Sequence, residues 1–576
     1  MKANPLLNHS AAHLLAAAIL KLYPDTKLAI GPAISEGFYY DFEFSSPISE
    51  KDLPVIEKVM KKIANNNYKF EKVEHQTLEN QPFKTELIND FTQAQKNITY
   101  YAMVNPNTKE LLFVDLCKGG HIDATKSLKY FKLLSLSGAY WKGDSKNKPL
   151  TRIYGTAWET EDQLNAYLQI RQERKERDHR KIGKDMEIFM FSPLSGQGFP
   201  IWLNNGIIIK EEIQNYLRKR EKFYNFTEVQ TPVFGEKALY QTSGHLAHYQ
   251  DDMFPILKVD NENLVLRPMT CPHHIIIFQS KKRSYRDLPM RISEHAVLYR
   301  YEKSGALSGL ERVRSMELTD AHIFCRNDQI VDEFKNAYQL INEVLTKFKI
   351  KIDYISLSLH DPQAKEKYYN DENMWNVAEK SLKDVLKTLN LKYEEKIGEA
   401  AFYGPKIDIQ VKNALGHEIT LSTLQLDFLL PQKFDISYVD KNQSLQKPVM
   451  IHRGLIGTYE RFIAILLEQY KGDLPFWIAP QQIIIIPVNN EKHQDYAQKI
   501  YQQLNNQNFR VTIDLRDLKL GKKMREAQMN KIKFQVVIGD EEVNHQLINV
   551  RAYGDEKQTK LSLELFIQNL KALLVN

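Results

Sequence analysis

The sequence has few cysteines, no long apolar run and little net charge. Its 576 residues include three cysteines, Cys117, Cys271 and Cys325, too few and too far apart for a disulfide framework. Each is therefore a candidate metal ligand or a buried apolar residue. No apolar segment is long enough to cross a bilayer, so we expect no membrane residence. The net charge of +6 does not by itself argue for a nucleic-acid partner.

The amino-terminal segment contains an apolar stretch that is typical of a signal peptide. His9 and His13 interrupt this stretch, and no convincing small-residue cleavage site follows it. We therefore predict that residues 1–24 form an amphipathic helix in a cytoplasmic protein.

The hydrophobic patterns predict a multidomain α+β protein. Apolar residues make up 43% of the chain and charged residues 26%, which is ordinary for a globular protein of this length. The predicted segments are residues 1–158, an α+β unit; 159–185, a polar linker helix; 186–475, helices with antiparallel period-two strands; and 476–576, a small doubly wound α/β unit. The charges of the linker are explained by a solvated surface or by a contact with RNA.

Residues 267–325 combine a thiol, several imidazoles and a row of arginines. Apolar and polar residues alternate up to Glu302 and again from Arg312, which predicts two antiparallel strands joined by a mobile loop. Such a hairpin can direct guanidinium groups at a phosphate. Arg267, Arg300 and Arg461 lie in other strand or helix contexts, and each arginine alone is equally well explained by a solvated surface.

Three segments together resemble the signature motifs of class II aminoacyl-tRNA synthetases. They are Pro232 after a long amphipathic helix, the Tyr-Arg-Tyr-Glu segment at residues 299–302, and GLIGTYERFIAIL at residues 454–466. Within this class, RPMTCPHH, SYRDLPMR, DAHIFC, FYGPKIDI, LQLDF and PVMIHRGLIGTYERF resemble the threonyl-tRNA synthetase family, and the likeness covers essentially the whole chain.

The resemblance implies an ATP-dependent ligase. It would join L-threonine to tRNA(Thr) and work as a cytoplasmic homodimer. Residues 1–158 would form an editing domain, 186–475 the class II catalytic domain with its antiparallel sheet, and 476–576 an anticodon-binding domain. The small domain that usually precedes the editing domain in this family is expected to be missing.

The resemblance also implies a zinc site made by Cys271, His322 and His452. Its fourth position would stay open, as in catalytic zinc sites. Threonine can chelate such an ion through its amine and hydroxyl, whereas valine cannot. Each ligand alone would more simply be a buried thiol or a core histidine. Strand alternation predicts that Asp320 and His322 share one face, so that both point into the same pocket.

Further residues acquire roles through the same resemblance. Arg300 would bridge the substrate carboxylate and the α-phosphate, Glu302 would orient adenine, and Arg312 and Arg461 would hold the triphosphate together with Mg²⁺. The remaining expected residues are Lys406 and Gln425 in catalysis, Gln425 and Met316 at the nucleotide, and Met269, Asp320 and Tyr403 at the amino acid. Met316 and Leu318 replace an aromatic residue and a glutamine found in many family members, so altered affinity is expected.

Transfer to the ribose of tRNA would use His245 as a proton acceptor. An imidazole with an unperturbed pKa near neutrality suits this task. His248 competes for the role, and a surface histidine without a catalytic role is the simplest alternative.

A second group of histidines and cysteine lies near the amino terminus. His9 and His13 are four residues apart, and Cys117 and His121 have the same spacing. The residues themselves indicate a second zinc site. The resemblance instead implies an editing site that hydrolyses mischarged seryl-tRNA(Thr) without a metal. Serine also chelates zinc and is one methyl smaller, a difference of about 1–3 kcal/mol, so a hydrolytic sieve is required.

The editing pocket and the anticodon domain supply the last expected residues. Tyr40, Lys84 and Asp115 match positions that line the family's editing pocket, and Gly120 replaces a common proline, which predicts a looser loop. Asp517, Glu542 and Arg551 match positions that contact anticodon bases, although ordinary surface charge would also explain them.

Two other functions compete with a ligase. A non-catalytic, tRNA-binding regulatory relative is expected to lack a hairpin arginine or a zinc ligand, and neither is missing. A freestanding aminoacyl-tRNA hydrolase would explain only the first 155 residues or so.

Overall fold

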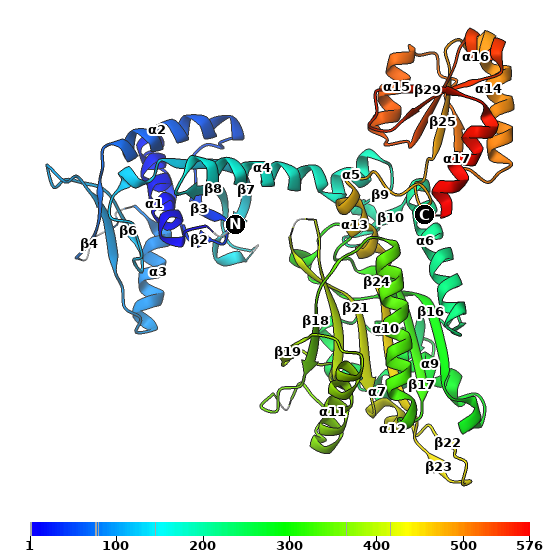
Figure 1. Cartoon of the computed structure of the whole chain (residues 1–576). Helices are drawn as coiled ribbons and strands as arrows, with labels where there is room; N and C mark the ends of the chain where they lie inside the picture. The colour runs from blue at the N-terminus through cyan, green and yellow to red at the C-terminus, as the bar shows by residue number, and fades with distance from the viewer. Residues whose placement is uncertain are drawn as a thin grey trace. The chain divides into compact units, whose positions relative to one another are not determined.

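The computed structural model describes residues 3–74, 78, 80–144, 146–364, 366–414 and 416–575. The chain divides into two compact units, residues 1–173 and 174–576 (Figure 1). The division falls inside helix α4 (Glu161–Arg177), in the predicted linker. A second helix, α5 (His179–Asp185), follows after Asp178, whose side chain accepts a hydrogen bond from the backbone N–H of Arg180. Nowhere in the described part of the chain is a helix both long and apolar enough to span a membrane.

The first unit is built around helix α1 (Pro5–Leu22), which Asn4 caps. The prediction of a helix is confirmed, but the prediction that it is amphipathic is wrong. The α1 helix is buried on nearly every side: Leu7, Asn8 and all of residues 10–19 are buried. Alanines at positions 11, 12 and 16–18 let neighbouring elements pack closely against it. A helix that is apolar around its whole circumference belongs inside a core.

Two antiparallel sheets and two further helices complete this unit. One sheet has the strand order β1-β3-β8-β7, with β2 paired to β3, and the other has the order β4-β5-β6. The elements are β1 (Lys27–Leu28), β2 (Ala33–Ile34), β3 (Gly37–Glu43), α2 (Leu53–Asn65), β4 (Lys69–Val73), α3 (Pro82–Gln93), β5 (Tyr100–Val104), β6 (Leu111–Leu116), β7 (Tyr130–Tyr140) and β8 (Pro149–Trp158).

The second unit contains an eight-stranded sheet in the order β11-β16-β17-β24-β21-β20-β18-β19. The pairs β11–β16 and β18–β19 are parallel, and the other pairs are antiparallel, as the period-two pattern predicts. The strands are β11 (Thr227–Glu228), β16 (Met290–Tyr299), β17 (Ser315–Cys325), β18 (Ile352–Leu359), β19 (Glu394–Ile397), β20 (Lys406–Lys412), β21 (Glu418–Asp427) and β24 (Val449–Thr458).

Helices cover both faces of this sheet. Four of them pack on one face, with α10 lying along β17, β24 and β21 (Figure 1). The helices on this face are α6 (Asn204–Phe223), α10 (Ile330–Lys347), α11 (Glu372–Thr388) and α13 (Tyr459–Tyr470). The other elements at the sheet's site side are α7 (Lys237–Ser243), α8 (His245–His248), α9 (Cys271–Gln279) and α12 (Leu429–Lys433).

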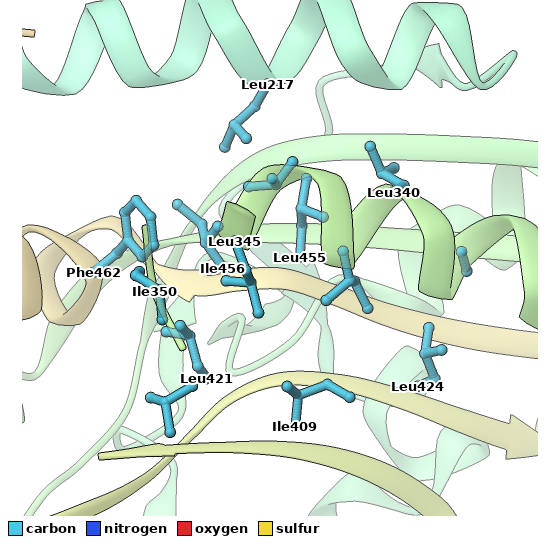
Figure 2. Close-up of a cluster of buried hydrophobic side chains, with 14 of the residues drawn as sticks. Leu217, Leu340, Leu345, Ile350, Ile409, Leu421, Leu424, Leu455, Ile456 and Phe462 are labelled. Atoms are coloured by element: carbon cyan, nitrogen blue, oxygen red, sulfur yellow. The ribbon is translucent and has the colours of Figure 1, made fainter. Parts of the chain in front are cut away.

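Strand alternation separates the apolar core from the site. Ala321, Ile323 and Cys325 of β17 belong to the large core cluster. Figure 2 shows part of this cluster, with Leu340 of α10 and Leu424 of β21 among the labelled side chains. Residues at even positions of β17, such as Phe324, pack against α9 on the opposite face. This confirms the prediction that Asp320 and His322 share a face.

Two local predictions between residues 267 and 325 are wrong. The apolar runs between residues 267 and 325 are typical of short strands, but CPHHIIIFQ forms helix α9. The hairpin is present as β16 and β17, but Arg300, Arg312 and Arg314 lie beyond the strand ends, in the connecting segment. That segment closes through a backbone hydrogen bond from Arg300 N–H to the carbonyl of Arg314. The arginines are therefore at the loop end of the hairpin.

The carboxy-terminal part of the second unit is a mixed sheet with helices on both faces. Its strand order is β26-β25-β27-β28-β29. The first three strands are parallel, as a doubly wound unit requires, but the last two pair antiparallel. The elements are β25 (Ile483–Pro487), α14 (Asn490–Asn505), β26 (Val511–Ile513), α15 (Leu520–Met529), β27 (Phe534–Ile538), α16 (Asp540–His545), β28 (Ile548–Ala552), β29 (Gln558–Leu561) and α17 (Leu563–Val575).

Candidate active site and a second histidine cluster

Cys271, His322 and His452 come together from three elements. Cys271 begins α9, while His322 of β17 and His452 of β24 are register partners on adjacent strands. The Nε2 atom of His322 lies 2.9 Å from Nδ1 of His452. All three side chains are buried, and their ligand atoms lie within 4.8 Å of one another.

Outer hydrogen bonds assign the protons of both imidazoles. Asp427 accepts a hydrogen bond from Nε2 of His452 at 2.8 Å, so the proton is on Nε2 and Nδ1 keeps a lone pair. On the other side, Nδ1 of His322 lies 2.7 Å from Nδ1 of His274, whose Nε2 lies 3.0 Å from a carboxylate oxygen of Glu294. The proton of His322 is then on Nδ1. Two lone pairs therefore face each other at 2.9 Å, an arrangement that a shared cation stabilises.

The protonation states of the cluster agree with a metal-binding role. Burial lowers the pKa of His322 well below its usual range, which keeps the imidazole neutral. Burial also raises the pKa of the Cys271 thiol, so a bound metal ion has to displace its proton. One thiolate and two neutral imidazoles form a donor set that suits a divalent transition-metal ion.

Polar residues surround this cluster on its open side. Asp320 accepts a hydrogen bond from Thr270, and burial raises the pKa of its carboxyl group. The ring of Tyr403 stacks on His452 with centroids 4.7 Å apart, and its hydroxyl donates to Gln425. The resemblance implies Asp320 and Tyr403 at the amino acid and Gln425 in catalysis and at the nucleotide, and in the structure all three lie beside the metal-binding candidates.

The arginines extend the site along the sheet. Nε of Arg300 donates to the carbonyl of Pro268, and Nε of Arg461 donates to the carbonyl of Glu311 at 3.2 Å. Burial and the charge of nearby Arg300 lower the pKa of Arg461. Such mutual repulsion favours the binding of an anion between the two guanidinium groups.

Three other predicted nucleotide residues, and Lys406, which was predicted to act in catalysis, make internal contacts. Arg312 pairs with Glu302 at 2.8 Å, in the segment that connects β16 to β17. Lys406 pairs with Asp408, while Met316 packs in a small apolar cluster with Leu298 and Val313.

Arg267 does not face an anion. It is buried, pairs with Glu294 at 3.0 Å and donates to the carbonyl of Val297. Its grouping with the other arginines of the predicted anion site is therefore wrong, because a buried carboxylate already neutralises its charge.

His245 does not have an ordinary imidazole pKa. It is fully buried, and burial lowers its pKa to about 3. Its Nδ1 lies 2.7 Å from the Ser243 hydroxyl, and its Nε2 lies 3.3 Å from Sδ of Met269 and 3.6 Å from Sγ of Cys271. The expected unperturbed imidazole is thus corrected. His248 stacks on Phe402 and is exposed.

The first unit brings its own histidines and cysteine together. Sγ of Cys117 lies 3.3 Å from Nε2 of His9 and 3.2 Å from Nε2 of His121. His9 and His121 stack with centroids 4.3 Å apart, and His13 meets His121 edge-on at 4.5 Å. We refer to His9, His13, Cys117 and His121 as the amino-terminal cluster.

Neutral groups orient the amino-terminal cluster. Nδ1 of His9 lies 3.2 Å from the carbonyl oxygen of Gly120, and Nδ1 of His121 lies 3.1 Å from the hydroxyl of Ser10. Gly120 has φ of +83°, which proline cannot adopt. The sequence predicts a looser loop at Gly120. The structure gives a different reason for this residue, because the backbone conformation at this position favours glycine.

Burial dominates the electrostatics of the amino-terminal cluster. It lowers the pKa of His121 to about 2 and that of His13 well below its usual range, and it raises the pKa of Cys117 to about 11. Neutral imidazoles and a neutral thiol result. Nearby, Asp115 pairs with Lys84 and accepts a hydrogen bond from Tyr40 at 2.6 Å.

A cavity of about 590 Å³ opens beside these groups. His9, His13, Cys117, Lys84 and Asp115 form part of its wall. The apolar part of the wall is formed by Pro5, Leu6, Ile30, Leu87, Phe91 and Ile98. The cavity can hold a group the size of a nucleoside and present it to the imidazoles.

The three predicted anticodon residues differ in their surroundings. Asp517 is exposed in the loop before α15. Glu542 is buried and accepts a hydrogen bond from the backbone N–H of Gly539, which caps α16. Arg551 on β28 is partly exposed and donates from Nε to the carbonyl of Asp555 at 2.6 Å.

Comparison with known families agrees with this architecture. Residues 256–470 match the class II core domain of tRNA synthetases (G, H, P, S and T), residues 482–573 match an anticodon-binding domain, and residues 99–154 match the second additional domain of threonyl- and alanyl-tRNA synthetases. The antiparallel sheet and its arginines therefore form the core of a class II aminoacyl-tRNA synthetase.

Individual relatives narrow the assignment. Threonine–tRNA ligase of Mycoplasmopsis pulmonis is 54% identical over 99% of this chain and 97% of its own length, and that of Staphylococcus carnosus is 50% identical over 98% and 87%. A structure described as the RNA-binding domain of threonyl-tRNA synthetase from Cryptosporidium parvum matches 69% of this chain and 98% of its own, with 34% identity and a TM-score of 0.65. The chain belongs to the threonine–tRNA ligase family.

Sequence reasoning missed the residues that surround the cluster of Cys271, His322 and His452. Asp427 lies in LQLDF and His274 in RPMTCPHH, but neither was assigned a role. The sequence contains only a weak signal for these two residues, because only the folded structure shows that Asp427 and His274 lie against candidate metal ligands. Ser10 in the first unit was missed for the same reason.

Proposed function

We propose that this chain activates L-threonine with ATP and transfers it to tRNA(Thr), and that it hydrolyses seryl-tRNA(Thr) formed in error. The observation that carries the proposal is the meeting of Cys271, His322 and His452 beside Asp320 and the arginine pair Arg300 and Arg461. A metal site and an anion site next to each other suit an amino acid joined to a phosphate.

Zn²⁺ is the ion that we propose for this cluster. One thiolate and two imidazoles form a donor set of zinc enzymes, and the lone pairs of His322 and His452 face each other at 2.9 Å, an arrangement that a shared cation stabilises. When bound, zinc supplies a Lewis acid with an open position for the amine and hydroxyl of threonine. Asp320 accepts hydrogen bonds from the same groups. Valine offers no hydroxyl, which leaves buried polar groups unsatisfied.

Charge neutralisation accounts for the first step. Arg300 contacts the carboxylate and the α-phosphate, and Arg461, Arg312 and Mg²⁺ hold the β- and γ-phosphates. The carboxylate oxygen attacks the α-phosphorus in line and pyrophosphate leaves. No side-chain nucleophile is needed, because positioning and electrostatic stabilisation provide the rate. Glu302 and Met316 lie at the nucleotide side, and Met269, Lys406, Tyr403 and Gln425 complete the pocket.

His245 acts in the transfer step by orienting the ribose hydroxyl. Its lowered pKa keeps the imidazole neutral, so it accepts a hydrogen bond but holds a proton poorly. The adenylate phosphate is the better acceptor for the proton that the ribose loses.

The amino-terminal cluster carries out the hydrolysis of seryl-tRNA(Thr). The cavity receives the seryl end of the tRNA, and the neutral imidazoles of His13 and His121 accept hydrogen bonds that orient the attacking water, while the water's proton passes to the leaving ribose oxygen. Lys84 and Tyr40 keep Asp115 paired, so that its charge does not attract a metal ion. Asp517, Glu542 and Arg551 are proposed to contact the anticodon.

Two further proposals follow from the function. The chain works as a homodimer, as expected for class II enzymes that pair through their first motif. It works in the cytoplasm, where ATP and uncharged tRNA are available.

Threonine-dependent exchange of pyrophosphate into ATP tests the main proposal. The purified chain is expected to catalyse exchange with threonine and not with valine, and to contain about one zinc ion per subunit by elemental analysis. Absence of exchange from zinc-replete protein would overturn the ligase assignment. Hydrolysis of seryl-tRNA without exchange would favour the freestanding hydrolase.

A further inference from the structure

A buried chain of hydrogen bonds leads away from His322. His274 is fully buried, with Nδ1 2.7 Å from Nδ1 of His322 and Nε2 3.0 Å from Glu294. Glu294 is held in turn by Arg267 at 3.0 Å and by the hydroxyl and backbone N–H of Thr231 at 2.8 and 3.0 Å. The mechanism described above uses none of these four residues.

The position of His274 in the fold is specific. It lies three residues after Cys271 on α9, so one helix supplies a ligand candidate and, one turn later, a partner for a second one. Glu294 on β16 is the register partner of Asp320 on β17, two residues before His322. The helix and two neighbouring strands thus hold the chain of hydrogen bonds in place.

The direction of the hydrogen bonds decides what the chain does. A carboxylate only accepts, so Glu294 places the proton of His274 on Nε2, and the Nδ1 lone pair of His274 then accepts from His322. With its proton fixed on Nδ1, His322 presents Nε2 as a lone pair toward His452 and Cys271. Without His274, the proton is free to move to Nε2, where it blocks a metal ion.

We infer that His274 and Glu294 are positioning residues that fix the tautomer and ring orientation of His322 for metal binding. This inference rests on the zinc site proposed above. A carboxylate acting through an imidazole also makes the ligand more basic, and loss of such a partner typically costs 10- to 100-fold in metal affinity. Asp427 acts directly on His452, so the two imidazoles are oriented by different routes.

Zinc titration of the full-length apoprotein against a chromophoric chelator tests the inference. His274→Ala is expected to raise the zinc dissociation constant about 10- to 100-fold. His274→Gln keeps a donor for Glu294 and an acceptor for His322, and it is expected to lose less than His274→Ala. The matched control is His273→Gln, since His273 neighbours His274 on α9 but its Nε2 lies 3.3 Å from the carbonyl of Phe234.

The outcomes are separable. If the wild-type protein binds no zinc, the proposed zinc site itself fails. If the wild-type protein binds zinc and folded His274→Ala binds it within twofold as tightly, the inference is overturned, because a packing role would lower the melting temperature without changing affinity. If His274→Ala does not fold, Glu294→Gln decides: weakened zinc binding supports the inference and unchanged binding overturns it. Cobalt absorption should show the same ligand set in every folded variant.

Discussion

The two clusters of this chain contain the same residue types in different surroundings. In the second unit, carboxylates receive the outward N–H groups of the imidazoles, directly at Asp427 and through His274 at Glu294. In the first unit, the partners are the neutral carbonyl of Gly120 and the neutral hydroxyl of Ser10. Carboxylate partners make imidazoles better metal ligands, whereas neutral partners leave them as weak bases beside an open cavity. The comparison teaches that the partners of a histidine, more than its sequence spacing, indicate its role.

The largest expected effect comes from Cys271→Ala. This change removes one of the three proposed zinc ligands and should lower threonine-dependent pyrophosphate exchange by about 10³-fold, the equivalent of about 4 kcal/mol. Seryl-tRNA deacylation should remain at the wild-type rate, because the amino-terminal cluster is in the other unit. Both assays are run on the same preparation. Equal losses in the two assays would contradict the separation of the clusters.

His13→Ala is expected to slow deacylation and to leave pyrophosphate exchange unchanged, which is the opposite of the effect of Cys271→Ala. Loss of an imidazole that orients the attacking water should slow seryl-tRNA deacylation by about 10²-fold. Pyrophosphate exchange with threonine should not change, and stable seryl-tRNA(Thr) should accumulate when serine is supplied. Unchanged deacylation in this variant would refute the assignment of the cluster to hydrolysis.

Ser10→Ala tests the neutral partner of His121. Its hydroxyl lies 3.1 Å from Nδ1 of His121 and accepts from the backbone N–H of Ile122. Loss of one hydrogen bond of about 1 kcal/mol should slow deacylation by roughly fivefold. Ser243→Ala serves as a matched control, because it removes the hydroxyl that contacts His245 in the other unit. That control should leave deacylation unchanged.

The smallest expected effect is on the pH profile of deacylation. An imidazole with the ordinary pKa of about 6.5 loses about nine-tenths of its neutral form at pH 5.5. Burial lowers the pKa of His121 to about 2 and also lowers that of His13, so both stay neutral at this pH. The deacylation rate, corrected for spontaneous hydrolysis, should therefore change less than twofold between pH 7 and pH 5.5. A tenfold fall over this range would show that the imidazoles titrate normally.

The sequence predicted most of the fold, and its errors have physical reasons. Strand alternation placed Asp320 and His322 on one face, because successive side chains of a strand point to opposite faces. The α1 helix was predicted to be amphipathic because His9 and His13 were counted as a polar face, but the structure buries His13 inside the core. Short apolar runs such as HHIIIF fit a strand or a helix equally well, and tertiary packing decided for α9.

The candidate sites were predictable only as lists of residues. The resemblance implied that Cys271, His322 and His452 are zinc ligands, but only the structure shows that their nitrogen and sulfur atoms come together. It also shows that Arg267 is neutralised by Glu294 and that His245 is fully buried. Both facts depend on long-range contacts that no local pattern contains. Partners such as Asp427 and His274 are invisible for the same reason.

The burial of α1 has a consequence for translational accuracy. His9 and His13, which we propose to belong to the hydrolytic site, are carried by a helix that is packed into the core of the first unit, so they are held in place before a mischarged end arrives. Any stress that loosens this unit removes proofreading while the separate catalytic unit continues to charge tRNA. A cell would then make proteins at a normal rate with serine at threonine codons.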